Sequence, residues 1–163
     1  YQGHGSFRLV SEKGTVVYVD PYVGEGYDLE ADLVLVTHEH HDHISGLPVF
    51  TKKRNIPIVA TQATCRCLAE KAPNLASLLR VQEAGTGVQV GELWVESFST
   101  PHDAAGSVGY SIAGAGCRAV LVQPIQPEKM LFFRLKRALE AFAMRCCPQK
   151  TAQQILHLGE DKR

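Results

Sequence analysis

The segment that most constrains this chain is a cluster of histidines that directly follows a short apolar run. Residues 38–43 read HEHHDH and hold four of the seven histidines, and the apolar residues 33–36 come just before them. Such a run is typical of a buried strand. Packing alone does not explain the cluster, because burying four imidazoles without partners would leave their ring nitrogens unpaired. A disordered histidine-rich tract is the alternative, although such tracts do not usually stand between a strand and a helix.

The residue types in this cluster are suited to hold a metal ion. Imidazole nitrogen and carboxylate oxygen bind Zn²⁺ at about 2.0–2.2 Å. His38 and His40 are two residues apart, so on extended backbone they point to the same side, and Asp42 and His43 follow where we expect a helix over residues 44–54 to begin. Zinc with an open coordination position lowers the pKa of bound water to about 7, which predicts a hydroxide that attacks an ester, lactone or phosphodiester. The ligand chemistry favours zinc, while manganese and iron also occupy such sites.

The composition is that of an ordinary globular protein. The chain has 163 residues, of which 45% are hydrophobic and 21% charged, and its formal net charge is zero. A neutral chain excludes whole-chain attraction to nucleic acid or to a membrane. The five cysteines form no C-x-x-C pair, which indicates a reduced, cytoplasmic setting. Neither a signal peptide nor an apolar run of eighteen residues is visible, so we expect no membrane span.

Strand and helix patterns alternate along the first 122 residues, which predicts an α/β fold. The expected strands are residues 7–10, 15–20, 33–36, 56–60, 88–90 and 93–98, with a last hairpin that turns at Gly114–Gly116. Residues 62–79 have helical spacing that is broken at Pro73.

The character of the chain changes at Gln123. Residues 123–163 hold 8 basic and 4 acidic side chains, and Leu131, Leu135 and Leu139 have helical spacing. We therefore expect a basic amphipathic helical tail, separate from a domain over residues 1–122. The tail is expected to pack on that domain; a helix that binds a membrane surface or a partner, and binding of nucleic acid, are the alternatives.

Three motifs resemble those of the metallo-β-lactamase fold hydrolases. THEHHDH matches the H-x-H-x-D-H signature, with Glu39 and His41 at the variable positions. VVYVDP resembles the first motif of the family, in which the residue matching Asp20 supports the metal site from behind the ligands. FSTPHDAAGSVGYSI resembles a later motif that makes His102 the next ligand. The resemblance covers roughly residues 1–122 and implies an αββα sandwich, here incomplete, with a C-terminal helix.

The resemblance also implies the roles of individual residues. One zinc would be held by His38, His40 and His102, and a second by Asp42 and His43, with Asp42 orienting the attacking water. YQGHGSF resembles a branch related to ascorbate-6-phosphate lactonases, in which the residue matching His4 lies near the metals. A polar residue in a turn is the alternative for His4. Residues 43–61 and 100–112 resemble a small bacterial phosphodiesterase and exonuclease branch.

The chain departs from the family pattern after residue 122. The family places an Asp that bridges both metals at the end of the strand CRAVLV, but Gln123 and Pro124 follow here. The last histidine ligand is not evident, and His157 is only a weak candidate for it. We therefore predict one tightly held zinc, a weak or absent second metal, and an exposed core face that the tail or a second copy in a homodimer covers.

The function predicted from these residues is that of a zinc-dependent hydrolase. A metal-bound hydroxide would attack a phosphodiester or a lactone in a small-molecule or nucleotide-like substrate, with Asp42, His43 and His4 as the catalytic candidates. The phosphodiester is favoured because the resemblance around His102 is the longer one. The alternative is a catalytically impaired metal-binding fragment or an interaction module.

Overall fold

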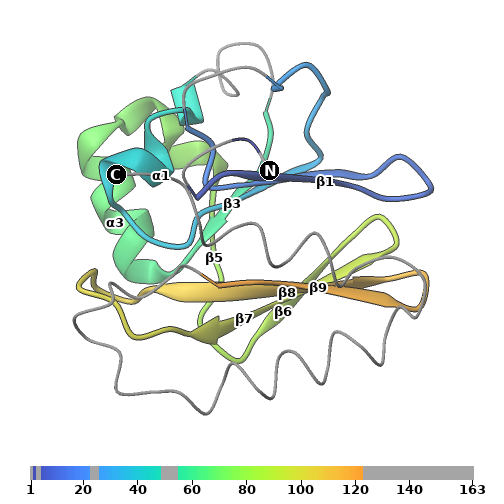
Figure 1. The fold of residues 1–163 in the computed structure, drawn as a ribbon. Helices are drawn as coiled ribbons and strands as arrows, with labels where there is room; N and C mark the ends of the chain where they lie inside the picture. Colours follow the sequence, from blue (N-terminus) through green and yellow to red (C-terminus); the bar gives the residue numbers. More distant parts are fainter. Residues whose placement is uncertain (1, 3–4, 23–25, 49–54, 123–163) are drawn as a thin grey trace, which may run out of the picture.

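The computed structural model describes residues 2, 5–22, 26–48 and 55–122, which build two β-sheets with helices on one side (Figure 1). The first sheet, called sheet A here, has the strand order β1-β2-β3-β4-β5, and the second, sheet B, has the order β6-β7-β8-β9. The strands of sheet A are Phe7–Val10, Val16–Val19, Leu33–Leu35, Ile58–Ala60 and Leu79–Val81. Those of sheet B are Gly87–Val90, Leu93–Ser99, Val108–Gly114 and Cys117–Leu121. The helices are α1, His41–Ile44; α3, Gln62–Lys71; and the 3₁₀ helix η1, Pro73–Leu78.

Sheet A is mainly parallel and is covered on both faces. Strand β1 runs antiparallel to β2, whereas β2, β3, β4 and β5 run parallel to one another. Every residue of β2, β3 and β4 is buried, which explains why these strands read as continuous apolar runs. Tyr18 and Val34 pack toward the helices, while Val17, Val19 and Leu35 pack toward sheet B. The period of two along each strand thus supplies two hydrophobic cores from one sheet.

Sheet B is antiparallel and presents one face to sheet A. Along β7 the buried residues alternate with more exposed ones, with Leu93 and Val95 buried and Trp94 43% exposed between them. The side chain of Tyr110 on β8 extends across the core, and its hydroxyl donates a hydrogen bond to the carbonyl oxygen of Val36 at 2.9 Å. The backbone N–H of Val108 donates to the carbonyl oxygen of Thr37 at 3.1 Å. These two bonds join the start of β8 to the end of β3.

The helical layer is organised by its caps and by one proline. Thr61 caps the N-terminus of α3, since its side chain accepts a hydrogen bond from the N–H of Thr64. The helix ends at Lys71, because Pro73 cannot continue the hydrogen-bond ladder and instead opens η1. No described helix is both long enough and apolar enough to span a membrane.

The structure confirms the predicted α/β fold, with two differences. The helix expected over residues 44–54 starts earlier, because α1 begins at His41 and carries Asp42 and His43 itself; residues 49–54 lie outside the described part. Strand β5 was not predicted, because Leu79-Arg80-Val81 is too short for its pattern to stand out from the helical segment before it. The predicted tail over residues 123–163 also lies outside the described residues.

Candidate metal centre

Three histidines from two distant segments converge at the ends of the sheets. His38 and His40 follow β3, and His102 lies in the loop between β7 and β8. One ligand nitrogen from each of the three lies within 4.8 Å of the others, so among the described residues this group can hold a metal ion. The ring of His38 is centred 4.6 Å from that of His40 and 4.2 Å from that of His102. The two motifs predicted to meet around a cation therefore do meet.

The loop that carries His102 is closed at its base. The N–H of Thr100 donates to the carbonyl oxygen of Ser107 at 3.1 Å, and the hydroxyls of the two residues lie 2.9 Å apart. Gly106 lies against the N-cap of α3, where a Cβ would come within 3.1 Å of the Thr61 hydroxyl oxygen. These contacts fix the loop between the helical layer and sheet B, so that His102 faces the end of β3.

His38 is the most buried member of the group, with no solvent-exposed surface. Its Nδ1 lies 2.9 Å from the hydroxyl of Thr37, while its Nε2 is buried without a hydrogen-bond partner. Burial, followed by the neighbouring His43 and His102, lowers the pKa of His38 to about 3. A neutral imidazole with an unpartnered buried nitrogen costs about 1–3 kcal/mol unless something binds that nitrogen. The donor set therefore fits a cation that binds several imidazoles.

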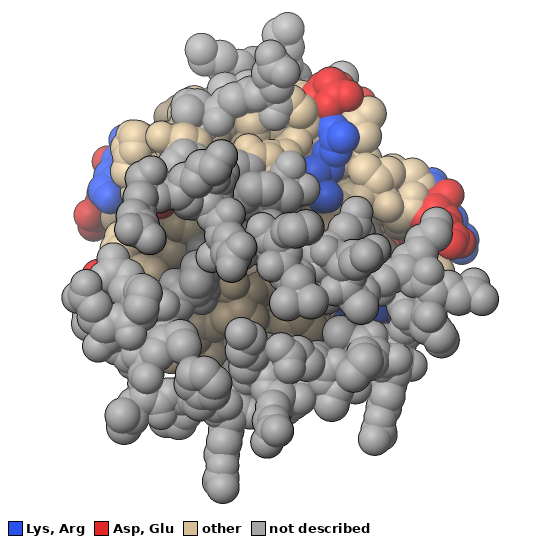
Figure 2. Space-filling model, in the orientation of Figure 1, with Lys and Arg blue, Asp and Glu red and all other residues tan. Residues whose placement is uncertain are grey.

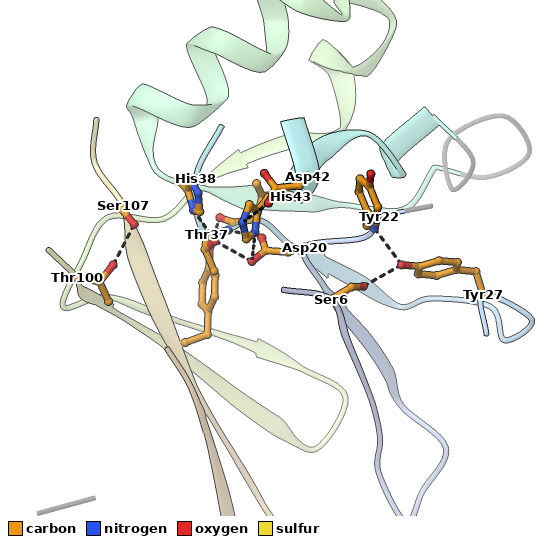
Figure 3. Close-up of polar contacts among 12 residues, drawn as sticks. Ser6, Asp20, Tyr22, Tyr27, Thr37, His38, Asp42, His43, Thr100 and Ser107 are labelled. Atoms are coloured by element: carbon orange, nitrogen blue, oxygen red, sulfur yellow. Dashed lines mark hydrogen bonds and ion pairs between the residues drawn. The ribbon is translucent and has the colours of Figure 1, made fainter. Parts of the chain in front are cut away.

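Asp20 contacts Thr37 and His43 next to the three-histidine group, and Figure 3 shows both contacts. Its side chain is completely buried, and it accepts hydrogen bonds at 2.7 Å from both the N–H and the hydroxyl of Thr37. Its Oδ2 also lies 3.0 Å from Nδ1 of His43. Burial lowers the pKa of His43, but the hydrogen bond with Asp20 and the charges of Asp20 and Asp42 outweigh this effect, so the net pKa is raised.

Helix α1 places a carboxylate and an imidazole beside the three-histidine group. His43 is centred 4.1 Å from the His38 ring, and its Nε2 lies 3.6 Å from Oδ2 of Asp42. The side chain of Asp42 is 51% exposed, so it borders the solvent side of the site. His41, the variable residue of the motif, is exposed. The structure thus brings Asp42 and His43 next to the three histidines, although outside the group whose nitrogens converge.

Asp103 is a site neighbour for which the sequence favoured a cap or turn over a role as a ligand. Its Oδ1 lies 2.6 Å from Nδ1 of His102 and 3.9 Å from Nε2 of His40. From sequence we would assign an Asp after His102 to a turn or cap, and only the fold shows that it also lies near His40. Glu39 contacts α3 instead, since it accepts a hydrogen bond from the hydroxyl of Thr64 at 3.5 Å.

Four residues weighed from sequence lie outside the described part of the chain: His4, Gln123, Pro124 and His157. The role predicted for His4 and the expected lack of a bridging carboxylate therefore stay predictions.

Known proteins resemble this chain in sequence over most of its described length. A family whose description is Beta-lactamase superfamily domain matches residues 20–122. A UPF0173 metal-dependent hydrolase of Koribacter versatilis is 28% identical over 129 residues, which are 73% of this chain and 54% of that protein. An exodeoxyribonuclease, YycJ, of Bacillus anthracis is 32% identical over 90 residues, which are 55% of this chain and 34% of that protein.

The fold also has solved counterparts. The structure of Igni18, a metallo hydrolase from Ignicoccus hospitalis, superposes with a TM-score of 0.62 at 19% identity, over 78% of this chain and 61% of that one. At this identity the likeness concerns the fold. The chain spans about half the length of the UPF0173 proteins it matches.

Proposed function

This chain belongs to the β-lactamase superfamily, and from that premise we propose that it forms the metal-binding part of a metal-dependent hydrolase. The observation that carries the proposal is the convergence of His38, His40 and His102 from two separate segments. The relative from Koribacter versatilis, a UPF0173 metal-dependent hydrolase, supports it. Because the chain spans 54% of that relative, the activity of the whole protein is part of the proposal.

Zinc is the metal that we propose for the three histidines. Three imidazoles leave a tetrahedral zinc one open position, as in catalytic zinc sites. The unpartnered Nε2 of the buried His38 fits such an ion. When bound, zinc would supply Lewis-acid chemistry. We propose one tightly held ion, with Asp42 and His43 as the ligands of a weaker second one; manganese and iron are the alternatives to zinc.

The residues around the three histidines have distinct proposed roles. Asp42 is half exposed beside the group, so it can accept a proton at its carboxylate and orient a reacting water. His43 is held from behind by Asp20, which fixes its ring next to His38. Asp103 restrains the ring of His102 in the same way. The predicted catalytic role of His4 stays part of the proposal.

A phosphodiester in a small or nucleotide-like substrate is the bond that we propose is cleaved. The exodeoxyribonuclease among the relatives supports a phosphodiester over a lactone. On the face drawn in Figure 2, described basic side chains at the edges lie beside acidic ones. Arg8, for example, forms an ion pair with Asp28 at 2.5 Å. Such pairing lowers the local positive charge that a long nucleic acid would use for its many phosphate contacts, which is consistent with the smaller substrate that we propose.

The proposal is tested by zinc stoichiometry together with hydrolysis. We expect one zinc per chain and cleavage of bis-p-nitrophenyl phosphate in preference to a simple lactone. His102→Ala should lose both zinc and cleavage. The matched control is His41→Ala, which removes an exposed imidazole from the same segment and should keep both. Equal zinc binding in the two variants would contradict the three-histidine site.

A second candidate function is metal binding without hydrolysis. The neutral Gln123 stands where the family pattern calls for a bridging carboxylate, which favours a catalytically impaired metal-binding unit or an interaction module. One zinc per chain without turnover of either substrate would support this candidate. Two zincs with turnover would reject it.

Location and assembly remain proposals as well. We propose a cytoplasmic protein, because its five cysteines include no C-x-x-C pair. A homodimer that covers the exposed core face is proposed too, and sedimentation of the purified chain at several concentrations distinguishes dimer from monomer.

A further inference from the structure

Thr37 lies between a buried carboxylate and the most buried histidine of the site. Its hydroxyl oxygen is 2.7 Å from Oδ2 of Asp20 and 2.9 Å from Nδ1 of His38 (Figure 3). Asp20, Thr37 and His38 are all buried, with at most 1% of their surface exposed, so water does not compete for these contacts. The three residues therefore form a linear series of contacts, from Asp20 through Thr37 to His38, that is shielded from water.

The direction of these hydrogen bonds follows from the number of protons available. A threonine hydroxyl has one proton to donate and can accept as well, whereas a carboxylate only accepts. The Thr37 hydroxyl donates to Asp20, so it has no proton left for His38. The contact at 2.9 Å is then a hydrogen bond only if Nδ1 of His38 carries the proton and donates it to Thr37.

The other nitrogen of His38 is fixed by the same reasoning. A neutral imidazole has a single ring proton, so a proton on Nδ1 leaves Nε2 with a free lone pair. That Nε2 is the buried nitrogen without a hydrogen-bond partner. A lone pair there can bind a cation, whereas a proton on Nε2 would block the metal site.

Asp20 acts on a second histidine directly. Its Oδ2 lies at an ion-pair distance of 3.0 Å from Nδ1 of His43, and the negative charge there favours the proton on Nδ1 in that ring too. His43 Nε2 is then free to face Asp42 and the site. One carboxylate thus sets the proton position of two histidines, of His43 by contact and of His38 through a hydroxyl.

We propose that Thr37 is a positioning residue, the middle member of a hydrogen-bond relay from Asp20 to His38. Because its hydroxyl donates to Asp20, it can only accept a hydrogen bond from His38, which keeps the ring proton of His38 on Nδ1 and leaves Nε2 unprotonated for the metal. The inference rests on the proposed metal centre, and it assigns a role to a side chain that would not itself touch the metal. Partners of this kind behind a metal ligand typically change metal affinity about 10–100-fold when they are removed.

The decisive variant is Thr37→Val, which replaces the hydroxyl by a methyl group of similar size. In the metal-free protein, long-range ¹H–¹⁵N spectra of the histidine rings should show Nδ1–H for His38 in the wild type and a shift toward Nε2–H in the variant. Zinc affinity, measured by competition with a chelator, should fall about 10–100-fold. Thr37→Ser keeps the hydroxyl and should restore both the ring state and the affinity.

The matched control is Thr15→Val at the other end of β2. The Thr15 hydroxyl also donates to a carboxylate, Oε2 of Glu92 at 2.8 Å, but no histidine accompanies that pair. The control should leave the His38 ring state and zinc affinity as in the wild type, whatever stability it loses. If Thr37 had only a structural role, Thr37→Val would lower stability, as the control can, and would leave the ring state of His38 unchanged. That result would overturn the proposal.

A second variant keeps the proposal testable if Thr37→Val does not fold. Asp20→Asn places an amide where Oδ2 was, because the other oxygen must still accept the N–H of Thr37. The amide N–H₂ donates, so the relay reverses and both His38 and His43 should move to Nε2–H. Unchanged ring states in this variant would overturn the relay. A wild type with Nδ1–H on His38 that binds no zinc would instead support the relay and contradict the proposed metal centre.

Discussion

Gly46 lies where the segment after α1 touches the backbone that follows Asp20. Its N–H donates to the carbonyl oxygen of Pro21 at 2.9 Å. A Cβ at this position would come within 2.5 Å of the carbonyl oxygens of both Pro21 and Tyr22. Backbone atoms cannot turn aside as a side chain can, so the close approach requires glycine.

Gly46→Ala should therefore destabilise the fold by about 1–3 kcal/mol, as overpacking does in a well-packed region. Urea denaturation of the metal-free protein measures the loss. The matched control is Gly114→Ala, whose Cβ would meet mainly the end of the flexible Leu93 side chain. A loss at Gly46 no larger than that at Gly114 would show that this backbone contact is not tight.

Among the elements, β8 links sheet B to sheet A near the metal centre. The hydroxyl of Tyr110 donates to the carbonyl oxygen of Val36, just after β3, at 2.9 Å, and it lies 3.3 Å from the carbonyl oxygen of Val59 in β4. Val36 lies two residues before His38. The link therefore couples the loop of His102, which precedes β8, to the segment of His38.

Tyr110→Phe keeps the ring and removes this link. We expect a loss of about 0.5–1.5 kcal/mol in the free energy of unfolding, with weaker zinc binding because the two histidine segments are less firmly held. Tyr18→Phe is the control, since the buried Tyr18 hydroxyl bonds to the carbonyl oxygen of Leu29 at 3.2 Å rather than between the sheets. If Tyr18→Phe weakened zinc binding as much, the link would have no special role.

The same tyrosine makes stability depend on alkaline pH. Burial raises the pKa of Tyr110 well above its ordinary value of 10.0. Above that ordinary value the unfolded chain releases the phenol proton while the folded chain keeps it, so stability falls as pH rises. Chemical denaturation from neutral pH to pH values above 10 should show a steeper fall in the wild type than in Tyr110→Phe. Parallel curves for the two proteins would contradict this.

At the scale of the whole molecule, a bound metal should hold together parts that are distant in sequence. His38 follows β3 of sheet A, and His102 lies in the loop between β7 and β8 of sheet B. An ion between them therefore binds only the folded chain. Binding to the folded state alone raises stability by about 2.7 kcal/mol at a free metal concentration one hundred times the dissociation constant.

Removing metal with a chelator should therefore lower the melting temperature, and added zinc should restore it. The increase should be lost in His102→Ala and kept in His41→Ala. A zinc-induced increase that persists in His102→Ala would place the ion elsewhere. Calorimetry with and without zinc measures the shift.

The ligand chemistry and most of the strands and helices of this protein can be predicted without the fold. The spacing of His38, His40 and Asp42 is local, and so is the apolar run before them, so both can be read without the fold. The metallo-β-lactamase fold predicted from these motifs is confirmed by the family match over residues 20–122 and by the solved counterparts. Strand β5 could not be predicted from the sequence, because its three residues, with an arginine at the centre, form a strand only by pairing with β4.

Which atoms face one another follows from the packing of the strands and loops, and the sequence alone does not show it. Thr37 stands next to the motif in sequence, yet its role depends on Asp20, which lies seventeen positions earlier and reaches it only because β2 and β3 are parallel neighbours. Asp103 likewise lies 3.9 Å from Nε2 of His40, in a segment far away in the sequence, only because the fold brings the two loops together. The physical reason is that hydrogen bonds depend on distance and direction within about 3 Å, and no local pattern of residue types specifies these across separate strands.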